Sequence, residues 1–303
     1  MLSQDAHRQA RYLSRWHQEY DQISPGHFHG RIDELHLGDL QVYRESTSQA
    51  LRQQCQVWSD SLWIGIPSQH AECRINGQAL GRNDLFCRPG DTLFELVTPP
   101  EQEILGLVVP RQALQAVAEA QGIALPPSIL EHQPRLTLPH NTRQQLSYLI
   151  RRLSCTDTSQ FSGRIHRDLL LTALLEVLAQ DTPTPSVAPS YRHRRTVVDT
   201  IKAYMDSHDE GPLTVTELCK VACVSRRTLQ YSFESILGIS PVQFLRVTRL
   251  NRVKRRLTAP DTTTVSDAAA SQGFYHLSQF AADYKQLFGE TPSTTLRNRA
   301  IPA

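Results

Sequence analysis

A pattern that occurs twice near the C-terminus constrains this 303-residue chain more than any other feature. Each copy reads as a short helix, a tight turn and a longer amphipathic helix, followed by a phenylalanine, a glycine and a proline. Glycine ends helices well and proline is favoured in the first turn of the next, so the order fixes where helices stop and start. The pattern predicts two helix-turn-helix units joined by one long helix. Its landmarks are Phe233, Gly238 and Pro241, then Phe280, Gly289 and Pro292.

The first copy carries explicit signals for helix starts. Thr214 and Glu217 form a capping box, and Ser225 is a good N-cap for the second helix. Apolar residues at helical spacing then pack the two helices together, which leaves polar and basic side chains facing outward. Such side chains suit base edges and phosphates, although an ordinary helical hairpin with a solvated basic face is the alternative for this stretch alone. The outward residues on the second helix are Arg226, Arg227, Gln230 and Tyr231.

Charge divides the chain into two parts. Residues 191–303 hold 16 Lys and Arg against 10 Asp and Glu, whereas residues 1–190 hold 16 against 20. A basic part on an acidic body indicates one region that meets a polyanion and one that does not. Residues 181–190 are rich in Pro, Ser and Thr, as linkers are. We therefore expect an effector-sensing and dimerisation domain over 1–180, a linker over 181–190, and a DNA-binding domain with two helix-turn-helix motifs over 191–303.

The N-terminal region predicts mixed structure. Residues 5–22 place Tyr12, Trp16 and Tyr20 four apart, which predicts a helix. Six to eight short strands then follow up to about residue 109, with hairpin turns at Gly38-Asp39 and Asn76-Gly77. This spacing predicts a small cupin-like β-barrel, whose mouth commonly holds a small ligand. The fold class is thus an α+β sensor domain, a small barrel plus helices, followed by an all-α domain.

Three helices are expected between the barrel and the linker. The last, residues 169–178, is apolar almost all round, which predicts burial against the barrel or against a second subunit. The start of the chain lacks the apolar core of a signal peptide, and no run approaches the roughly 18 apolar residues of a membrane span. We therefore expect a cytoplasmic protein with no membrane partner.

Aromatic and charged residues within the strand region are candidates for binding a small effector. A tryptophan beside a carboxylate suits a small cation, whereas an arginine suits a carboxylate ligand. The candidate effector-binding residues are Arg44, Glu45, Trp58, Trp63 and Glu95.

An alternative of another class comes from histidines in the same region. On a strand, His27 and His29 share a face, and with Glu34 and His36 they resemble a cupin-type metal set. That alternative is a cupin-like metalloenzyme with a DNA-binding tail. Histidines at a strand start that hold no metal are the favoured interpretation, so no metal and no enzymatic activity are expected. A DNA binder that needs no ligand is a third alternative.

Residues 195–299 resemble the DNA-binding domain of the AraC/XylS family of bacterial transcription regulators. The resemblance implies that both units read double-stranded DNA, that RNA polymerase is a partner and that the protein forms a homodimer. By position, Ser225, Arg227, Gln230 and Tyr231 form the first reading set, and His276, Ser278 and Gln279 the second, with Lys285 also on the DNA. Ala282 and Asp283 depart from members with a basic residue there, which implies that the second helix mainly holds phosphates. The family signature appears as Ala269, Gly273-Phe274, Phe280, Tyr284-Lys285, Phe288-Gly289 and Pro292.

The N-terminal region resembles regulators of ethanolamine-utilisation operons, over residues 20–30, 40–45 and 63–67. The resemblance implies ethanolamine as effector with adenosylcobalamin as a co-effector, and no resident cofactor. Similar sensor domains serve regulators of other amine or aromatic-acid pathways, such as anthranilate. We expect a ligand-responsive activator of a catabolic operon for ethanolamine or another amine, with a regulator responsive to an aromatic acid as the alternative.

Overall fold

The computed structural model of the protein describes residues 1–68, 72–125, 135–155, 163–179, 189–207, 213–260, 262 and 264–299. The chain divides into two compact units. The sheet unit comprises residues 1–20 and 29–185, and the helical unit comprises residues 186–303 together with residues 21–28. Of the predicted linker, residues 181–188 lie outside the described residues, and the last two begin a helix. Among the described helices, none combines the length and the apolar character needed to cross a membrane.

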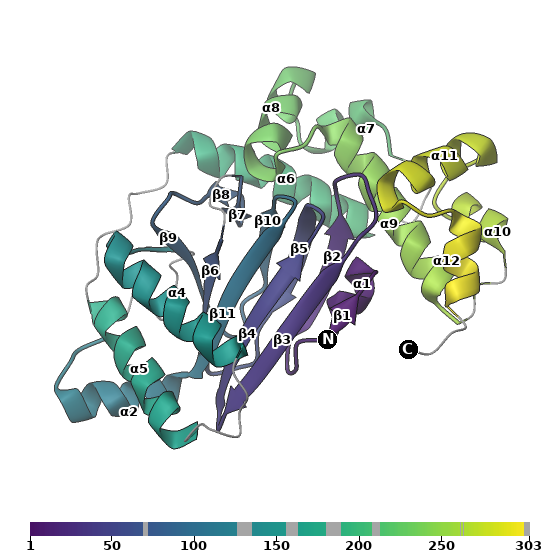
Figure 1. Ribbon diagram of the computed structural model, residues 1–303. Coiled ribbons are helices and arrows are strands. Elements are labelled where there is room, and N and C mark those ends of the chain that lie inside the picture. Colours follow the sequence, from purple (N-terminus) through teal and green to yellow (C-terminus); the bar gives the residue numbers. More distant parts are fainter. Residues whose placement is uncertain are drawn as a thin grey trace. The chain divides into compact units, whose positions relative to one another are not determined.

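Two antiparallel sheets build the sheet unit (Figure 1). The seven-stranded sheet runs in the order β1 (Leu2–Ser3), β3 (Gly30–Leu37), β4 (Leu40–Thr47), β11 (Gln102–Pro110), β6 (Ser61–Pro67), β9 (Asp84–Pro89) and β12 (Arg135–Thr137). The five-stranded sheet runs in the order β2 (His17–Gln22), β5 (Leu51–Gln56), β10 (Phe94–Thr98), β7 (Arg74–Ile75) and β8 (Gln78–Ala79). In the described residues both orders are open at their ends, so a closed cupin-like barrel is not confirmed.

Both predicted hairpin turns are confirmed. Gly38-Asp39 joins β3 to β4, with Leu37 paired to Leu40 across the turn. Asn76-Gly77 joins β7 to β8, with φ of 49° and 78°. Two successive positive φ angles match the twist of the flanking strands, which is why Asn-Gly is favoured there.

Alternation along the strands gives the seven-stranded sheet two different faces. One face carries Val42, Ile64 and Leu107 into an apolar core shared with three helices. These are α2 (Arg111–Gln121), α4 (His140–Cys155) and α5 (Gly163–Ala179), drawn along one side of the sheet in Figure 1. The apolar segment 169–178 lies in α5, where Leu171 and Leu174 are fully buried in this core. Most of the apolar side chains of this segment therefore pack in the core of a single chain.

The predicted helix over residues 5–22 is wrong. Only Ala6–Gln9 forms a short helix, α1, and His17–Gln22 forms strand β2. A spacing of four is also twice the strand period of two, so residues at positions 12, 16 and 20 share a face in either structure. Tyr20 is completely buried, and the Trp16 ring packs edge-on against Tyr43 at 5.7 Å between ring centroids. Burial against the sheets therefore outweighed local helical spacing.

The helical unit follows the predicted starts and stops closely. Thr214 and Glu217 make both hydrogen bonds of the capping box, and the Ser225 side chain accepts from the Thr228 amide at 3.2 Å. Gly238 and Gly289 end their helices with φ of 74° and 72°. The helices are α6 (Pro189–Ser207), α7 (Val215–Val221), α8 (Arg226–Leu237), α9 (Pro241–Thr258), α10 (Val265–Ala270), α11 (Leu277–Phe288) and α12 (Pro292–Asn298).

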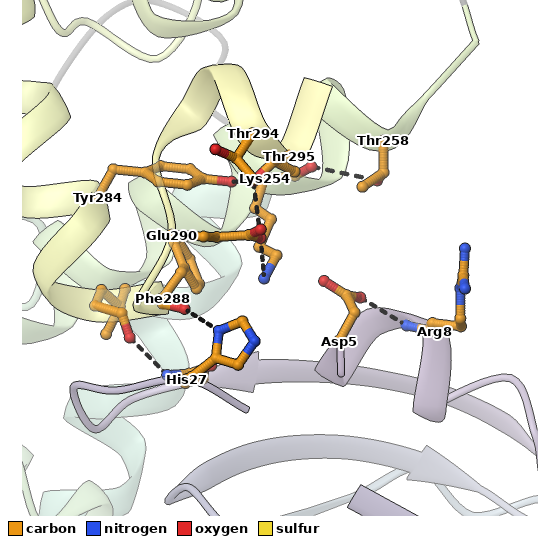
Figure 2. Close-up of polar contacts among 12 residues, drawn as sticks. Asp5, Arg8, His27, Lys254, Thr258, Tyr284, Phe288, Glu290, Thr294 and Thr295 are labelled. Atoms are coloured by element: carbon orange, nitrogen blue, oxygen red, sulfur yellow. Dashed lines mark hydrogen bonds and ion pairs between the residues drawn. The ribbon is translucent and has the colours of Figure 1, made fainter. Parts of the chain in front are cut away.

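Residues 21–28 complete the helical unit, a role that the sequence pattern did not indicate. The Asn251 side chain accepts from the Gln22 amide at 3.1 Å and donates to the Gln22 carbonyl at 2.9 Å. The Gln22 side chain donates to the Leu287 carbonyl at 2.6 Å, and His27 Nδ1 lies 3.3 Å from the Phe288 carbonyl (Figure 2). The last carbonyls of a helix have no partner within it, so this segment satisfies the C-terminus of α11.

Candidate nucleic-acid interface

Helix α8 has a polar, basic face that is separate from the apolar face by which the helix packs. Its apolar residues Leu229 and Phe233 are fully buried, whereas Arg226 and Arg227 are exposed. Tyr231 is 58% exposed, and the Arg194 guanidinium of α6 lies 5.1 Å from its ring centroid. A face of this kind offers cations for phosphates and planar donors for base edges.

Ser225 differs from its neighbours in the first predicted set. Its hydroxyl accepts the Thr228 amide hydrogen and lies 3.0 Å from the Thr228 hydroxyl. This residue therefore starts α8, and at the same time it lies on the exposed surface at the N-terminus of that helix. The positive end of the helix dipole at this terminus favours an anion such as a phosphate.

Helix α11 has the same design with fewer cations. Phe280, Tyr284 and Phe288 are buried, and the predicted residues of this region all lie on the exposed side. Lys285 is the cation of that exposed side within α11. The predicted residues are His276, Ser278, Gln279 and Lys285.

In both α8 and α11, a glutamine side chain donates a hydrogen bond to a carboxylate one turn further along the helix. Gln230 Nε2 donates to Glu234 Oε1 at 2.6 Å, and Gln279 Nε2 donates to Asp283 Oδ1 at 2.7 Å. Asp283 is also bound by Arg246 of α9 at 2.6 Å. Because a carboxylate accepts hydrogen bonds only, it binds the NH2 end of the amide and fixes the orientation of the glutamine side chain. The amide oxygen and the second N–H then remain available for a ligand. The position where a basic residue was expected in some relatives thus holds an acid that orients Gln279.

Arg249, Arg252 and Arg256 recur every three or four residues along α9, which places them on one side of the helix, but they do not form one basic face. Arg249 turns inward, and burial lowers the pKa of its guanidinium. Arg252 lies 3.6 Å from Asp206, and Arg256 is exposed. Three residues on one side of a helix in sequence therefore have three different surroundings.

The predicted effector residues split between different faces of the sheets. Neighbouring residues on a strand point to opposite faces, so Arg44 and Glu45 are separated by the sheet itself. Arg44 pairs with Glu103 at 2.5 Å, and Glu95 pairs with Arg52 at 2.6 Å. Trp58 lies under the Arg15 guanidinium, 4.3 Å from the ring centroid.

Glu45 and Trp63 share the interior between the sheets with residues that the pattern missed. Tyr20 donates to Glu45 at 3.0 Å, and the Trp63 indole donates to the Tyr43 hydroxyl at 2.9 Å. Trp63 stacks on Phe94 of the other sheet at 4.8 Å between centroids. Tyr20 was missed because its segment was predicted to be helical. Tyr43 lies on the same face as Glu45, two residues away, and this spacing was the available signal.

The histidines proposed for the metal alternative have other contacts. Glu34 accepts from the Ser14 hydroxyl at 2.6 Å and lies 3.2 Å from His36 Nε2. The His29 amide donates to Ser48 at 2.8 Å. In the part of the chain that the structure describes, no three His, Cys, Asp or Glu side chains are grouped so that they could hold a metal ion.

Comparison with known proteins matches residues 218–298 to the model of a helix-turn-helix domain. A probable thc operon regulatory protein of Rhodococcus erythropolis is 36% identical over 96 residues, which are 31% of this chain and 29% of that protein. XylDLEGF operon transcriptional activator 3 of Pseudomonas putida is 25% identical over 251 residues, 77% of this chain and 73% of that one. The solved AraC-like transcriptional activator CuxR covers 80% of this chain and 86% of its own, at 17% identity and a TM-score of 0.40.

The chain thus spans less than a third of the Rhodococcus relative. The region matched by the helix-turn-helix model, residues 218–298, contains α8 and α11. This is also the region in which buried aromatic residues and exposed polar residues alternate at helical spacing. The helical unit therefore contains a helix-turn-helix domain over residues 218–298, and the chain is similar to regulators of bacterial operons.

Proposed function

We propose that this protein is a ligand-responsive activator of a catabolic operon, and that it reads DNA with two helix-turn-helix units, α7–α8 and α10–α11. The observation that carries the proposal is the exposed polar face of α8 inside the matched domain. Successive major grooves on one side of DNA lie about 34 Å apart, so two reading helices suit two half-sites one turn apart. The name of one relative, an operon transcriptional activator, supports activation, and the name of another, an operon regulatory protein, supports control of an operon. Such a role implies RNA polymerase as a partner and a cytoplasmic location, and it depends on no enzymatic activity.

Arg227→Ala tests sequence reading by α8. DNA is selected from a random pool by the wild-type protein, and affinities are then compared on selected and unrelated duplexes. A bidentate contact to a base is worth about 1–3 kcal/mol, so the variant should lose about that much on selected DNA and little on unrelated DNA. Arg256→Ala removes an exposed cation from α9 and serves as the matched control. Equal losses on both duplexes for Arg227→Ala would reduce Arg227 to a phosphate contact.

We propose that the effector binds the sheet unit and that it is a small amine. The support is chemical: Glu45 lies among Tyr20, Tyr43 and Trp63 in the interior, a set that suits a cation, whereas Arg44 is engaged by Glu103 on the opposite face. An aromatic acid such as anthranilate remains the alternative, and Arg44 would then have to leave Glu103. Ethanolamine as the particular amine, and adenosylcobalamin as its co-effector, rest on the sequence resemblance.

Thermal unfolding of the full chain separates these effectors. A ligand at 100 times its dissociation constant stabilises the folded protein by about 2.7 kcal/mol. We expect ethanolamine, alone or with adenosylcobalamin, to raise the melting temperature of the wild-type protein and not that of Glu45→Gln. A rise with anthranilate or benzoate alone, abolished in Arg44→Ala, would contradict the amine assignment.

We also propose a homodimer formed through α5. Its residues Ile165 and Leu169 are 67% and 48% exposed, and their spacing of four places them on one face of the helix. The buried leucines of the same helix belong to the core of the sheet unit, so this exposed face is the part left for a second subunit.

A further inference from the structure

Helix α9 joins the two helix-turn-helix units, and its contacts with them differ in kind. Toward the first unit, Phe244 packs on Phe233 of α8 with 5.2 Å between ring centroids. Toward the second, Arg249 donates from Nε to the Gln272 carbonyl at 2.8 Å and from Nη2 to the Gly273 carbonyl at 2.7 Å. These two carbonyls lie in the turn between α10 and α11. The Arg249 guanidinium therefore binds the turn from which α11 starts, and this turn sets the direction of that helix.

The same guanidinium is also fixed by an aromatic ring. Its Cζ lies 4.2 Å from the centroid of Phe274, and Phe274 packs on Phe280 of α11 at 5.0 Å. The contact continues along α11 through Tyr284 to Phe288, at 5.7 and 4.6 Å. At the far end, Lys254 of α9 lies 4.5 Å from the Phe288 ring centroid and 3.4 Å from Glu290. Figure 2 draws these three side chains. Two cations of α9, Arg249 and Lys254, thus contact the first and the last ring of this series of aromatic residues.

We infer that Arg249 is a positioning residue for DNA recognition: it locks α11 to the connecting helix and so sets the separation between the two half-sites. The inference rests on the proposed function, in which both α8 and α11 read DNA. Phe244 and Arg249 are five residues apart on one helix, a rise of about 7.5 Å, so no flexible joint lies between the two attachments. The hydrogen bonds of Arg249 go to backbone carbonyls of the turn, so its effect on α11 passes through the turn.

Arginine is required at this position by geometry as well as by charge. The planar guanidinium donates two hydrogen bonds in a fixed fork while it stacks on a ring, whereas a lysine ammonium is a point charge that cannot do all three. Arg249→Lys therefore keeps the charge and loses the paired contact. Arg249→Met keeps the apolar stem and loses both.

The test measures how much the second half-site adds to binding by the full chain. Wild-type protein selects DNA from a random pool, and a footprint defines the half-sites. The α8 half-site is the one whose protection Arg227→Ala weakens. Affinities are then measured on a duplex with both half-sites, one with the α8 half-site alone, and one with a single base pair inserted between them. The insertion moves the second half-site by about 3.4 Å along the DNA axis.

We expect wild-type protein to prefer the double site over the single site by about tenfold or more, and to lose this preference on the insertion. Arg249→Met should bind the α8 half-site as wild type does and lose most of the preference. Arg249→Lys should be intermediate. The control Arg256→Met, which removes an exposed cation from the same helix, should weaken both duplexes by one factor.

Two results would overturn the inference, and they are distinguishable. If Arg249→Met folds and keeps the full preference for the double site, or weakens both duplexes equally, Arg249 does not set the separation. If the wild-type footprint shows a single half-site, reading by α11 is wrong, and the proposed two-helix function fails with it. Thermal unfolding checks that each variant is folded, and Arg249→Lys carries the test if Arg249→Met is not.

Discussion

At the scale of single residues, the two neighbours Arg44 and Glu45 have opposite surroundings. Arg44 meets Glu103, while Glu45 is buried and accepts hydrogen bonds from Gln9 and Tyr20. Burial raises the pKa of the Glu45 carboxyl above its ordinary value of 4.5, and the hydrogen bonds oppose this only in part. The folded chain thus binds this proton more tightly than the unfolded chain. The stability that Glu45 contributes is complete below pH 4.5 and is lost as pH rises through the raised pKa.

Glu45→Gln tests this directly. An amide stays neutral at every pH, so the variant should lose the fall in stability that wild type shows as pH rises above 4.5. The effect is measured from the melting temperature at about six pH values between pH 4 and pH 8. Glu176→Gln, at an exposed site on α5, is the matched control and should follow wild type. Parallel curves for Glu45→Gln and wild type would show that Glu45 titrates as an ordinary carboxyl.

At the scale of elements, the sequence predicted what local chemistry decides. The starts of α7 and α8 at Thr214 and Ser225 and the stops at Gly238 and Gly289 follow from side chains within one turn. Strand β2 was mistaken for a helix because a spacing of four satisfies both periods. Segment 21–28 could not be found by pattern, because its partners Asn251 and Leu287 are more than 200 positions away.

Asn251→Ala tests whether that segment stabilises the helical unit. The change leaves the buried amide and carbonyl of Gln22 without their side-chain partner, which should cost about 1–3 kcal/mol of unfolding free energy. Denaturant unfolding of the full chain measures it. Asn298→Ala, at an exposed position on α12, should cost much less. Equal, small losses in the two variants would mean that residues 21–28 add little stability.

At the scale of the whole molecule, composition indicated two parts, and the structure has two compact units. The helical part and the side chains on its exposed faces were predicted well, because amphipathic helices record their burial in sequence. The paths of the strands were less predictable. Which strand pairs with which depends on distant partners, so neither the open sheets nor the hydrogen bond from Tyr20 to Glu45 followed from the pattern.

Dimer formation is the prediction at this scale. Ile165→Glu with Leu169→Glu should turn a dimer into a folded monomer, because both side chains are exposed in the single chain. Leu171→Glu should instead unfold the sheet unit, because it buries a charge in the core. Sedimentation velocity with circular dichroism distinguishes a dimer, a folded monomer and a chain whose sheet unit is unfolded. A wild-type protein that sediments as a monomer at micromolar concentration would contradict the proposed dimer.

Whether α8 and α11 both enter DNA can be read from a hydroxyl-radical and methylation-protection footprint of the full chain on selected DNA. We expect two protected segments on one side of the duplex, about one helical turn or 34 Å apart, with guanines protected in both major grooves. Arg227→Ala should weaken one segment and Gln279→Ala the other. A single protected segment, or two segments that respond identically to both variants, would contradict this expectation.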